Sequence, residues 1–168
     1  MIKTLNTLFV TMFGLGRVKI IPGTFGSLAT IILLYVFFHT LNVSSNIILI
    51  GLIIIFTYSF SAVATHIKDC KNKDPKEVVI DEVIGQTIPI YLFETSHGTT
   101  TESQEAILFY FYIFILFRFF DIKKPFPINY FDKKFKNSFG VIFDDVIAGF
   151  YVVLTLVIFM VIKTKFFT

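Results

Sequence analysis

Residues 47–64 read IILIGLIIIFTYSFSAVA and decide the fold class, because this stretch contains no Asp, Glu, Lys or Arg. An α-helix rises 1.5 Å per residue, so about 20 residues cross the roughly 30 Å hydrocarbon core of a bilayer. The stretch is close to that length and apolar throughout. It therefore predicts a helix that spans a membrane.

Other apolar stretches accompany this one, at residues 25–41, 106–120 and 141–162. The last is long enough to span a bilayer, the first is a little short, and the middle one is shorter still. A fifth stretch, residues 83–93, contains Pro89 and predicts a broken or re-entrant segment packed inside a bundle. We therefore expect an all-α helical bundle, an integral membrane protein with four or five membrane-associated helices and no sheet.

The composition of the whole chain agrees with this class. The 168 residues suffice for one domain, which we place at residues 1–168. Apolar residues make up 55% and charged residues only 16%, which excludes a disordered chain and an ordinary soluble domain. The net charge of +3 is too small and too dispersed to indicate a nucleic-acid partner. The single cysteine, Cys70, excludes an internal disulfide.

The basic residues are divided unevenly among the loops. If the spans alternate, every Lys and Arg except Lys163 and Lys165 lies on one face of the membrane. The positive-inside rule places that face in the cytoplasm. Residues 94–105 contain no Lys or Arg and predict a loop on the opposite side. This topology requires residues 83–93 to cross, or nearly cross, the membrane.

A glycine-rich segment precedes the first apolar stretch on the predicted cytoplasmic side. Residues 14–28 read GLGRVKIIPGTFGSL. Its Thr24 and Ser27 lie at the start of a helix, and a helix N-terminus offers free N–H groups to an anion. The alternative is a capped helix after a Pro-Gly turn, with no ligand.

Two pairs of adjacent carboxylates each begin an apolar segment; they are Asp81 with Glu82 and Asp144 with Asp145. Each pair is followed by a glycine, Gly85 or Gly149, that permits close approach between helices. Carboxylate oxygens are hard ligands and suit Mg²⁺. The alternative is that the acids are solvated in the headgroup zone or stabilise a helix N-terminus.

A third polar cluster lies in FRFFDIKKPFPI, residues 117–128. Arg118 and Asp121 are three residues apart, which places them on one face of a helix. The chain contains only two arginines, Arg17 and Arg118, so an arginine beside an aspartate indicates bidentate phosphate binding. The alternative is an arginine whose side chain only reaches the membrane interface.

Four segments together resemble the successive motifs of the phosphatidylglycerophosphatase A family; they are PGTFGSL (residues 22–28), DPKEVVIDEVIGQ (74–86), FRFFDIKKPFPI (117–128) and GVIFDDVIAGF (140–150). Residues 17–21 depart from the family's Pro- and Ala-containing stretch, so no role is carried over to Arg17. The resemblance implies a helical bundle, Mg²⁺ dependence, and hydrolysis of phosphatidylglycerophosphate to phosphatidylglycerol and phosphate. It also implies a phospholipid substrate and a multi-pass protein of the bacterial cytoplasmic (inner) membrane, with the active site on the cytoplasmic side.

We expect metal-assisted hydrolysis by direct attack of water, because no nucleophilic side chain is evident. The expected metal ligands are carboxylates: Asp81, Glu82, Asp121, Asp144 and Asp145. All of these except Asp144 are also expected to be catalytic. The expected substrate-binding residues, which offer cations or hydroxyls, are Thr24, Ser27, Arg118 and Lys124.

A different class of function stays open, namely a small membrane transport or binding protein that uses intramembrane carboxylates for a cation. Such sites lie near the middle of the bilayer. Here the paired acids are expected at the cytoplasmic ends of the apolar segments, which favours the phosphatase.

Overall fold

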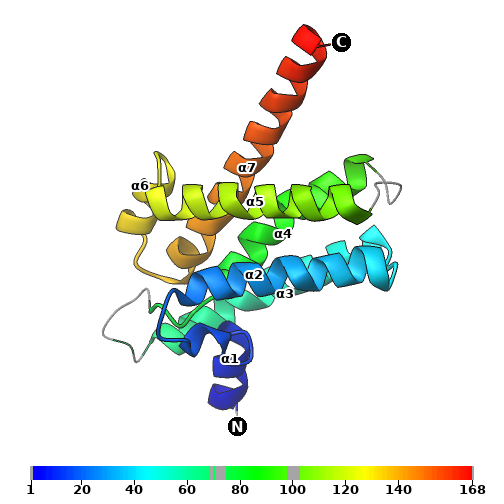
Figure 1. Ribbon diagram of the computed structural model, residues 1–168. Helices are drawn as coiled ribbons and strands as arrows, with labels where there is room; N and C mark the ends of the chain where they lie inside the picture. Colours follow the sequence, from blue (N-terminus) through cyan, green and yellow to red (C-terminus); the bar gives the residue numbers. More distant parts are fainter. Residues whose placement is uncertain (1, 69, 71–74, 98–102, 168) are drawn as a thin grey trace.

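The computed structural model describes residues 2–68, 70, 75–97 and 103–167 (Figure 1). Within this part of the chain every regular element is a helix, which confirms the predicted all-α fold. The α-helices are α1 (Ile2–Val10), α2 (Pro22–Tyr35), α3 (Ser45–Ile67), α4 (Ile80–His97), α5 (Ser103–Lys123), α6 (Ile128–Lys134) and α7 (Ser138–Phe167). A 3-10 turn, η1 (Leu15–Arg17), precedes α2, and a π-helical turn, η2 (Val36–Thr40), continues it.

Three segments of the described chain are long and apolar enough to cross a membrane, judged by length and composition: Pro22–Thr40, Ser45–Ile67 and Ser138–Phe166. This is fewer than the four or five membrane-associated helices expected. The helix α4 carries three acids, and the last turns of α5 carry Arg118 and Asp121. Large apolar side chains are nevertheless exposed around the bundle, such as Ile54 of α3 and Ile158 of α7. Exposed apolar surface of this extent is typical of a protein that faces lipid.

The segment around Pro89 differs from the prediction. The helix α4 is continuous through Pro89 rather than broken or re-entrant. A proline inside a helix removes one backbone hydrogen bond, but packed neighbours make this tolerable within a bundle. Here α4 packs against α2, α3, α5 and α7, so it is the central helix of the bundle.

The helices α2 to α5 alternate in direction between two ends of the bundle (Figure 1). The helices α2 and α4 begin at the same end, where Gly23 meets the Glu82 side chain. Both finish at the other end, where His39 of η2 lies 2.9 Å from Glu94 of α4. The helix α4 thus runs from one end to the other, as the alternation requires. The last turns of α7 project away from the other helices (Figure 1).

Local sequence explains where the helices at the first end begin and stop. Pro22 occupies the first turn of α2, where its missing N–H costs nothing. The backbone of Lys124 turns into the left-handed region, with φ 43°, directly after α5. Pro125 then prevents the helix from continuing. At the start of α7, Asn137 Oδ1 accepts a hydrogen bond from the Gly140 N–H at 3.1 Å, as an N-cap does.

Candidate active site

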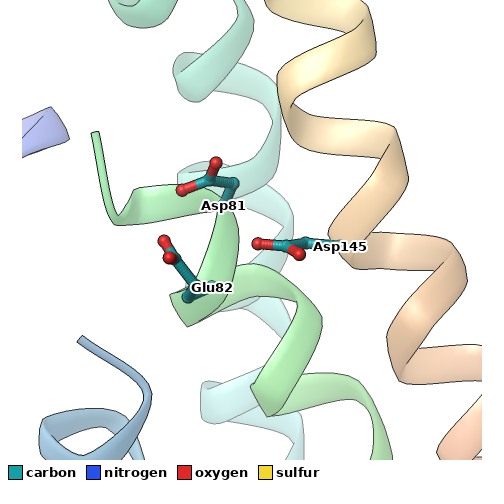
Figure 2. Close-up of side chains that lie close together, drawn as sticks. All are labelled: Asp81, Glu82 and Asp145. Carbon is teal, nitrogen blue, oxygen red and sulfur yellow. The ribbon is translucent and has the colours of Figure 1, made fainter. Parts of the chain in front are cut away.

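Three carboxylates meet at the end of the bundle where α4 begins. Figure 2 shows Asp81 and Glu82 in the first turn of α4, with Asp145 of α7 pointing toward them. One oxygen from each side chain lies within 4.8 Å of the others. Asp81 and Asp145 are buried, and Glu82 is half-buried. We call these three residues the acidic cluster.

The acidic cluster has the properties of a cation site. Within the described part of the chain, the buried oxygens Asp81 Oδ1 and Glu82 Oε2 have no hydrogen-bond partner. Buried carboxylate oxygens without partners are costly, and like charges at short range repel each other strongly away from water. A metal ion removes both penalties, so the cluster can bind a metal ion. Hard oxygen donors of this kind fit Mg²⁺.

Glycine in α4 allows the two helices to place their acids together. A Cβ atom added at Gly85 would lie 2.5 Å from the backbone oxygen of Asp145 and 2.8 Å from the Phe117 ring. Only a residue without a side chain fits between α4 and α7 there. The predicted close approach at Gly85 is therefore confirmed, and it brings Asp145 beside the first turns of α4.

The acidic cluster forms part of a pocket of about 550 Å³. Its walls come from the start of α2, the residues just before α4, the end of α5, and α7. Most of the predicted site residues line it: Thr24, Asp81, Glu82, Arg118, Asp121, Lys124, Asp144 and Asp145. Four segments far apart in the sequence therefore converge on one pocket.

Arg118 stands in the pocket between the acids and α2. Its Nη1 atom lies 2.7 Å from Asp121 Oδ2 and 3.7 Å from Glu82 Oε1. The same nitrogen donates a hydrogen bond to Ser27 Oγ at 3.3 Å. Arg118 Nε is buried without a partner among the described residues, so part of the guanidinium is unsatisfied.

Ser27 was expected to contact the substrate, but it does not line the pocket. Its side chain is fully buried on α2. Its hydroxyl reaches the pocket only through the hydrogen bond from Arg118. In this geometry Ser27 orients Arg118, and Thr24 is the hydroxyl that faces the pocket.

Lys124 is engaged by carboxylates of the chain itself. Its Nζ atom donates to Asp144 Oδ2 at 2.6 Å and to Asp132 Oδ1 at 2.9 Å. Partial burial lowers the pKa of Lys124, but the charge of Asp144 and the hydrogen bonds that the ammonium donates to both acids outweigh burial, so the pKa lies above its ordinary value. Asp132 lies in α6 and was not singled out from the sequence, since nothing in its surroundings distinguishes it from a solvated acid.

The five expected metal ligands thus fall into two groups. Asp81, Glu82 and Asp145 form the compact cluster. Asp121 pairs with Arg118, and Asp144 pairs with Lys124. The last two carboxylates hold the cations of the pocket in place. Lys19 and Lys76 also line the pocket, although no role was predicted for them.

Gly23 fixes the distance between α2 and the acidic cluster. A Cβ atom at this position would lie 2.0 Å from Glu82 Oε1 and 3.2 Å from Arg118 Nη1. Any side chain at Gly23 would therefore displace Glu82. Pro22 and Gly23 therefore have two roles: they begin α2, and Gly23 leaves the space that the Glu82 side chain occupies in the pocket.

A second buried polar pair lies at the opposite end of the bundle. Glu94 was expected in a loop, but it lies within α4 and is buried. Its partner is His39, whose ring also stacks on Tyr35 with a centroid distance of 4.9 Å. Glu94 lies 12 residues after Glu82, about 18 Å along the helix, so the pair is separate from the pocket.

Comparison with known proteins adds an independent observation. A family model described as Phosphatidylglycerophosphatase A matches residues 8–160. A Phosphatidylglycerophosphatase A of Haemophilus influenzae is 37% identical over 142 residues, which cover 84% of this chain and 80% of that protein. A putative phosphatidylinositol-3-phosphatase of Bacteroides thetaiotaomicron is 33% identical over 151 residues, 88% of each chain. A Phosphatidylglycerophosphatase A of Escherichia coli is 33% identical over 138 residues, 82% of this chain and 73% of that protein. No solved structure matches.

Proposed function

This chain belongs to the phosphatidylglycerophosphatase A family and is a phosphatase, and on that premise we propose that it hydrolyses phosphatidylglycerophosphate to phosphatidylglycerol and phosphate with Mg²⁺. The observation that carries the proposal is the pocket in which three clustered carboxylates face an arginine. The pocket lies at the end of helices long enough to span a membrane, as a phospholipid headgroup requires.

The acidic cluster would hold Mg²⁺ through Asp81, Glu82 and Asp145, because their buried oxygens need a cation. When bound, Mg²⁺ lowers the pKa of water and offsets the negative charge of the phosphate. In this arrangement Asp145 comes from α7 while the other two acids come from α4, so the ligand set depends on the contact between these helices.

Arg118 would bind the phosphomonoester. A planar guanidinium donates to two phosphate oxygens at once, and Asp121 and Ser27 fix its orientation. Thr24 offers a hydroxyl from α2 on the same side of the pocket. Lys124 holds Asp144 beside Asp145 and adds positive charge at the rim.

The reaction then follows from position and charge. Water attacks the phosphorus in line with the ester oxygen, the phosphorus–oxygen bond to glycerol breaks, and the glycerol oxygen leaves and takes up a proton. Most of the rate enhancement in such reactions comes from positioning and electrostatic stabilisation. Among the described residues that line the pocket, Thr24 carries the one hydroxyl, and no histidine lines the pocket to activate it, so we favour direct attack by water.

We place the protein in the bacterial cytoplasmic membrane with the pocket on the cytoplasmic side. The described basic residues near the pocket, which include Lys19, Lys76 and Lys123, lie at one end of the helices. Loops with excess Lys and Arg face the cytoplasm. One domain, residues 1–168, would carry the whole activity.

A transport function fits less well. A transport site is expected near the middle of the bilayer. Here Asp81 and Glu82 lie in the first turn of α4, at the end of the bundle. A different lipid phosphate is the stronger alternative, because the Bacteroides relative is named for phosphatidylinositol 3-phosphate, which is also a phosphomonoester.

The test is phosphate release by the purified protein in detergent micelles. We expect release from phosphatidylglycerophosphate with Mg²⁺, and none when Mg²⁺ is chelated. Phosphatidylinositol 3-phosphate, tested in parallel, should give at least about ten-fold lower catalytic efficiency. Preference for the inositol lipid would overturn the substrate assignment, and full activity without divalent cations would overturn the metal assignment.

A further inference from the structure

A second cavity, of about 360 Å³, lies in the bundle apart from the acidic pocket. The helices α2 and α3 both pack against α4, and a groove remains between them. Val83 and Thr87 of α4 line the groove between the two walls. The volume falls in the range of cavities that hold small ligands.

The groove presents an apolar surface, although two of its lining residues carry hydroxyl groups. Its two polar residues are threonines whose hydroxyls are already used. Thr30 Oγ1 donates to Gly26 O at 2.8 Å, and Thr87 Oγ1 donates to Val83 O at 2.6 Å. Neither hydroxyl has a proton left to donate, and both threonines are buried, so the lining is almost entirely apolar. Apolar cavities stay dry or take apolar guests.

The groove opens toward the membrane. Its walls belong to two of the three candidate spans, α2 with its continuation and α3. Thr30 and Ile48 are buried within it, whereas Leu33 and Ile47 on its edges are exposed. The exposed edges belong to candidate spanning helices, so in a bilayer they would face hydrocarbon and a lipid chain could enter from the side.

The groove is also in register with the acidic pocket along the same two helices. Val83 directly follows Glu82, and Thr87 lies about 6 Å beyond Val83 along α4. On α2, Thr30 lies about 9 Å beyond Thr24. On α4 the groove therefore begins directly beside the pocket, and on α2 it begins fewer than two helical turns beyond Thr24, so an acyl chain can reach the groove while the phosphate of the same lipid lies in the pocket.

From this register, volume and apolar lining we propose that the groove binds one acyl chain of the phospholipid whose phosphate occupies the acidic pocket. This inference rests on the proposed function and extends it from the headgroup to the lipid tail. Binding of the chain would position the headgroup, since contacts remote from the reacting atoms contribute to substrate affinity.

Gly51 gives the inference a sharp test. It lines the groove from α3, and a Cβ atom added there would have no neighbour within 4 Å. A larger side chain would therefore occupy the groove without straining the fold, and replacing a glycine inside a helix favours the helix. Gly51→Phe fills the groove, and Ile54→Phe is the matched control, because Ile54 is 62% exposed on α3 and does not line the groove.

The experiment compares two substrates that share a headgroup: phosphatidylglycerophosphate with long acyl chains, and its deacylated, water-soluble counterpart. For Gly51→Phe we expect KM for the long-chain lipid to rise at least about ten-fold while kcat changes little. Turnover of the deacylated compound should not change, and Ile54→Phe should match the wild type with both substrates. Unchanged KM for the lipid, or an equal loss with both substrates, would overturn the proposal.

A second measurement does not depend on activity. Phosphatidylglycerol with a photoreactive acyl chain should label residues 47–55 of the wild type, and Gly51→Phe should reduce this labelling at least about five-fold. Unlabelled phosphatidylglycerophosphate should compete better than phosphatidylcholine; equal competition would assign the groove to bulk lipid and overturn the proposal. A change in oligomeric state in Gly51→Phe would show that the groove binds a second copy of the chain, which would also overturn the proposal. If no substrate is hydrolysed, the proposed function fails, while the labelling still tests whether the groove binds an acyl chain.

Discussion

Gly149 of α7 lies in direct backbone contact with Gly85 of α4: a Cβ atom at Gly149 would come within 2.4 Å of the Gly85 carbonyl oxygen. Two helices can approach this closely only where both lack side chains. The contact lies one turn away from Asp145 on α7 and from Glu82 on α4. It therefore sets the separation of the carboxylates that form the acidic cluster.

Gly149→Ala is expected to separate α4 from α7. The added methyl overlaps backbone atoms, which cannot move as a side chain can, so the protein should lose about 2 kcal/mol of stability. Thermal unfolding in detergent and phosphate release should both decline. The control is Gly51→Ala, whose Cβ meets nothing and should leave stability unchanged or slightly higher. Equal thermal stability of the two variants would contradict this account of the helix contact.

Asp145→Asn and Asp81→Asn should each lower phosphate release at least about 100-fold, because an amide keeps the shape but not the charge that holds a metal ion. Both variants should also need more Mg²⁺ for half-maximal rate. Asp121→Asn should lower the rate but raise the Mg²⁺ requirement less than Asp145→Asn does, since Asp121 pairs with Arg118 and lies beside the acidic cluster. The control is Glu105→Gln, an exposed acid at the other end of the bundle. Comparable losses in the control would refute the site.

Arg118→Lys tests bidentate phosphate binding. Lysine retains the charge but not the planar pair of donors, so we expect catalytic efficiency to drop about 10- to 100-fold, or about 1.4–2.7 kcal/mol. Lys133→Arg, in an exposed position of α6, serves as the reverse control and should be neutral. Near wild-type turnover in Arg118→Lys would show that this arginine does not clamp the phosphate, because a lysine also reaches the interface.

Gly23→Ala should lower the activity of the protein without lowering its thermal stability. The new Cβ atom would collide with Glu82 Oε1, which lies at the end of a flexible side chain and can move away. The fold should survive, while the acidic cluster loses its geometry. We expect at least about ten-fold lower phosphate release with an unfolding temperature close to that of the wild type. A variant with normal activity would show that the position of Glu82 does not matter for the reaction.

Glu94→Leu should destabilise the protein without affecting the pocket. The substitution leaves His39 buried without its partner, a change that costs about 3 kcal/mol in buried pairs. Exchanging both residues for apolar ones, His39→Phe with Glu94→Leu, should restore part of the lost stability, because neither member of the pair is then left buried without its partner. The Mg²⁺ requirement of any remaining activity should match the wild type. A loss of activity in the double variant at normal stability would instead place this pair in the reaction.

The sequence by itself predicted the class of protein, which the structure confirms, and the residues that we expect to carry its chemistry. Long apolar stretches such as residues 47–64 predict spanning helices because the need to satisfy backbone hydrogen bonds in hydrocarbon is met locally, within each helix. Acids at the edge of such stretches are expensive, and two adjacent pairs of them, each followed by a glycine, marked Asp81 and Asp145 as candidates together with their neighbours Glu82 and Asp144. The same holds for Arg118, as one of only two arginines in the chain.

Only the tertiary structure decided which partner each of these residues contacts. Five carboxylates looked alike in the sequence, yet Asp144 holds Lys124 while Asp145, its neighbour, joins the acidic cluster. Adjacent residues on a helix point about 100° apart, so their partners depend on how α7 is rotated against its neighbours. That rotation is fixed by contacts distant in sequence, above all the approach of Gly149 to Gly85. The continuity of α4 through Pro89 and the burial of Glu94 have the same origin, because both depend on helices that surround α4 on every side.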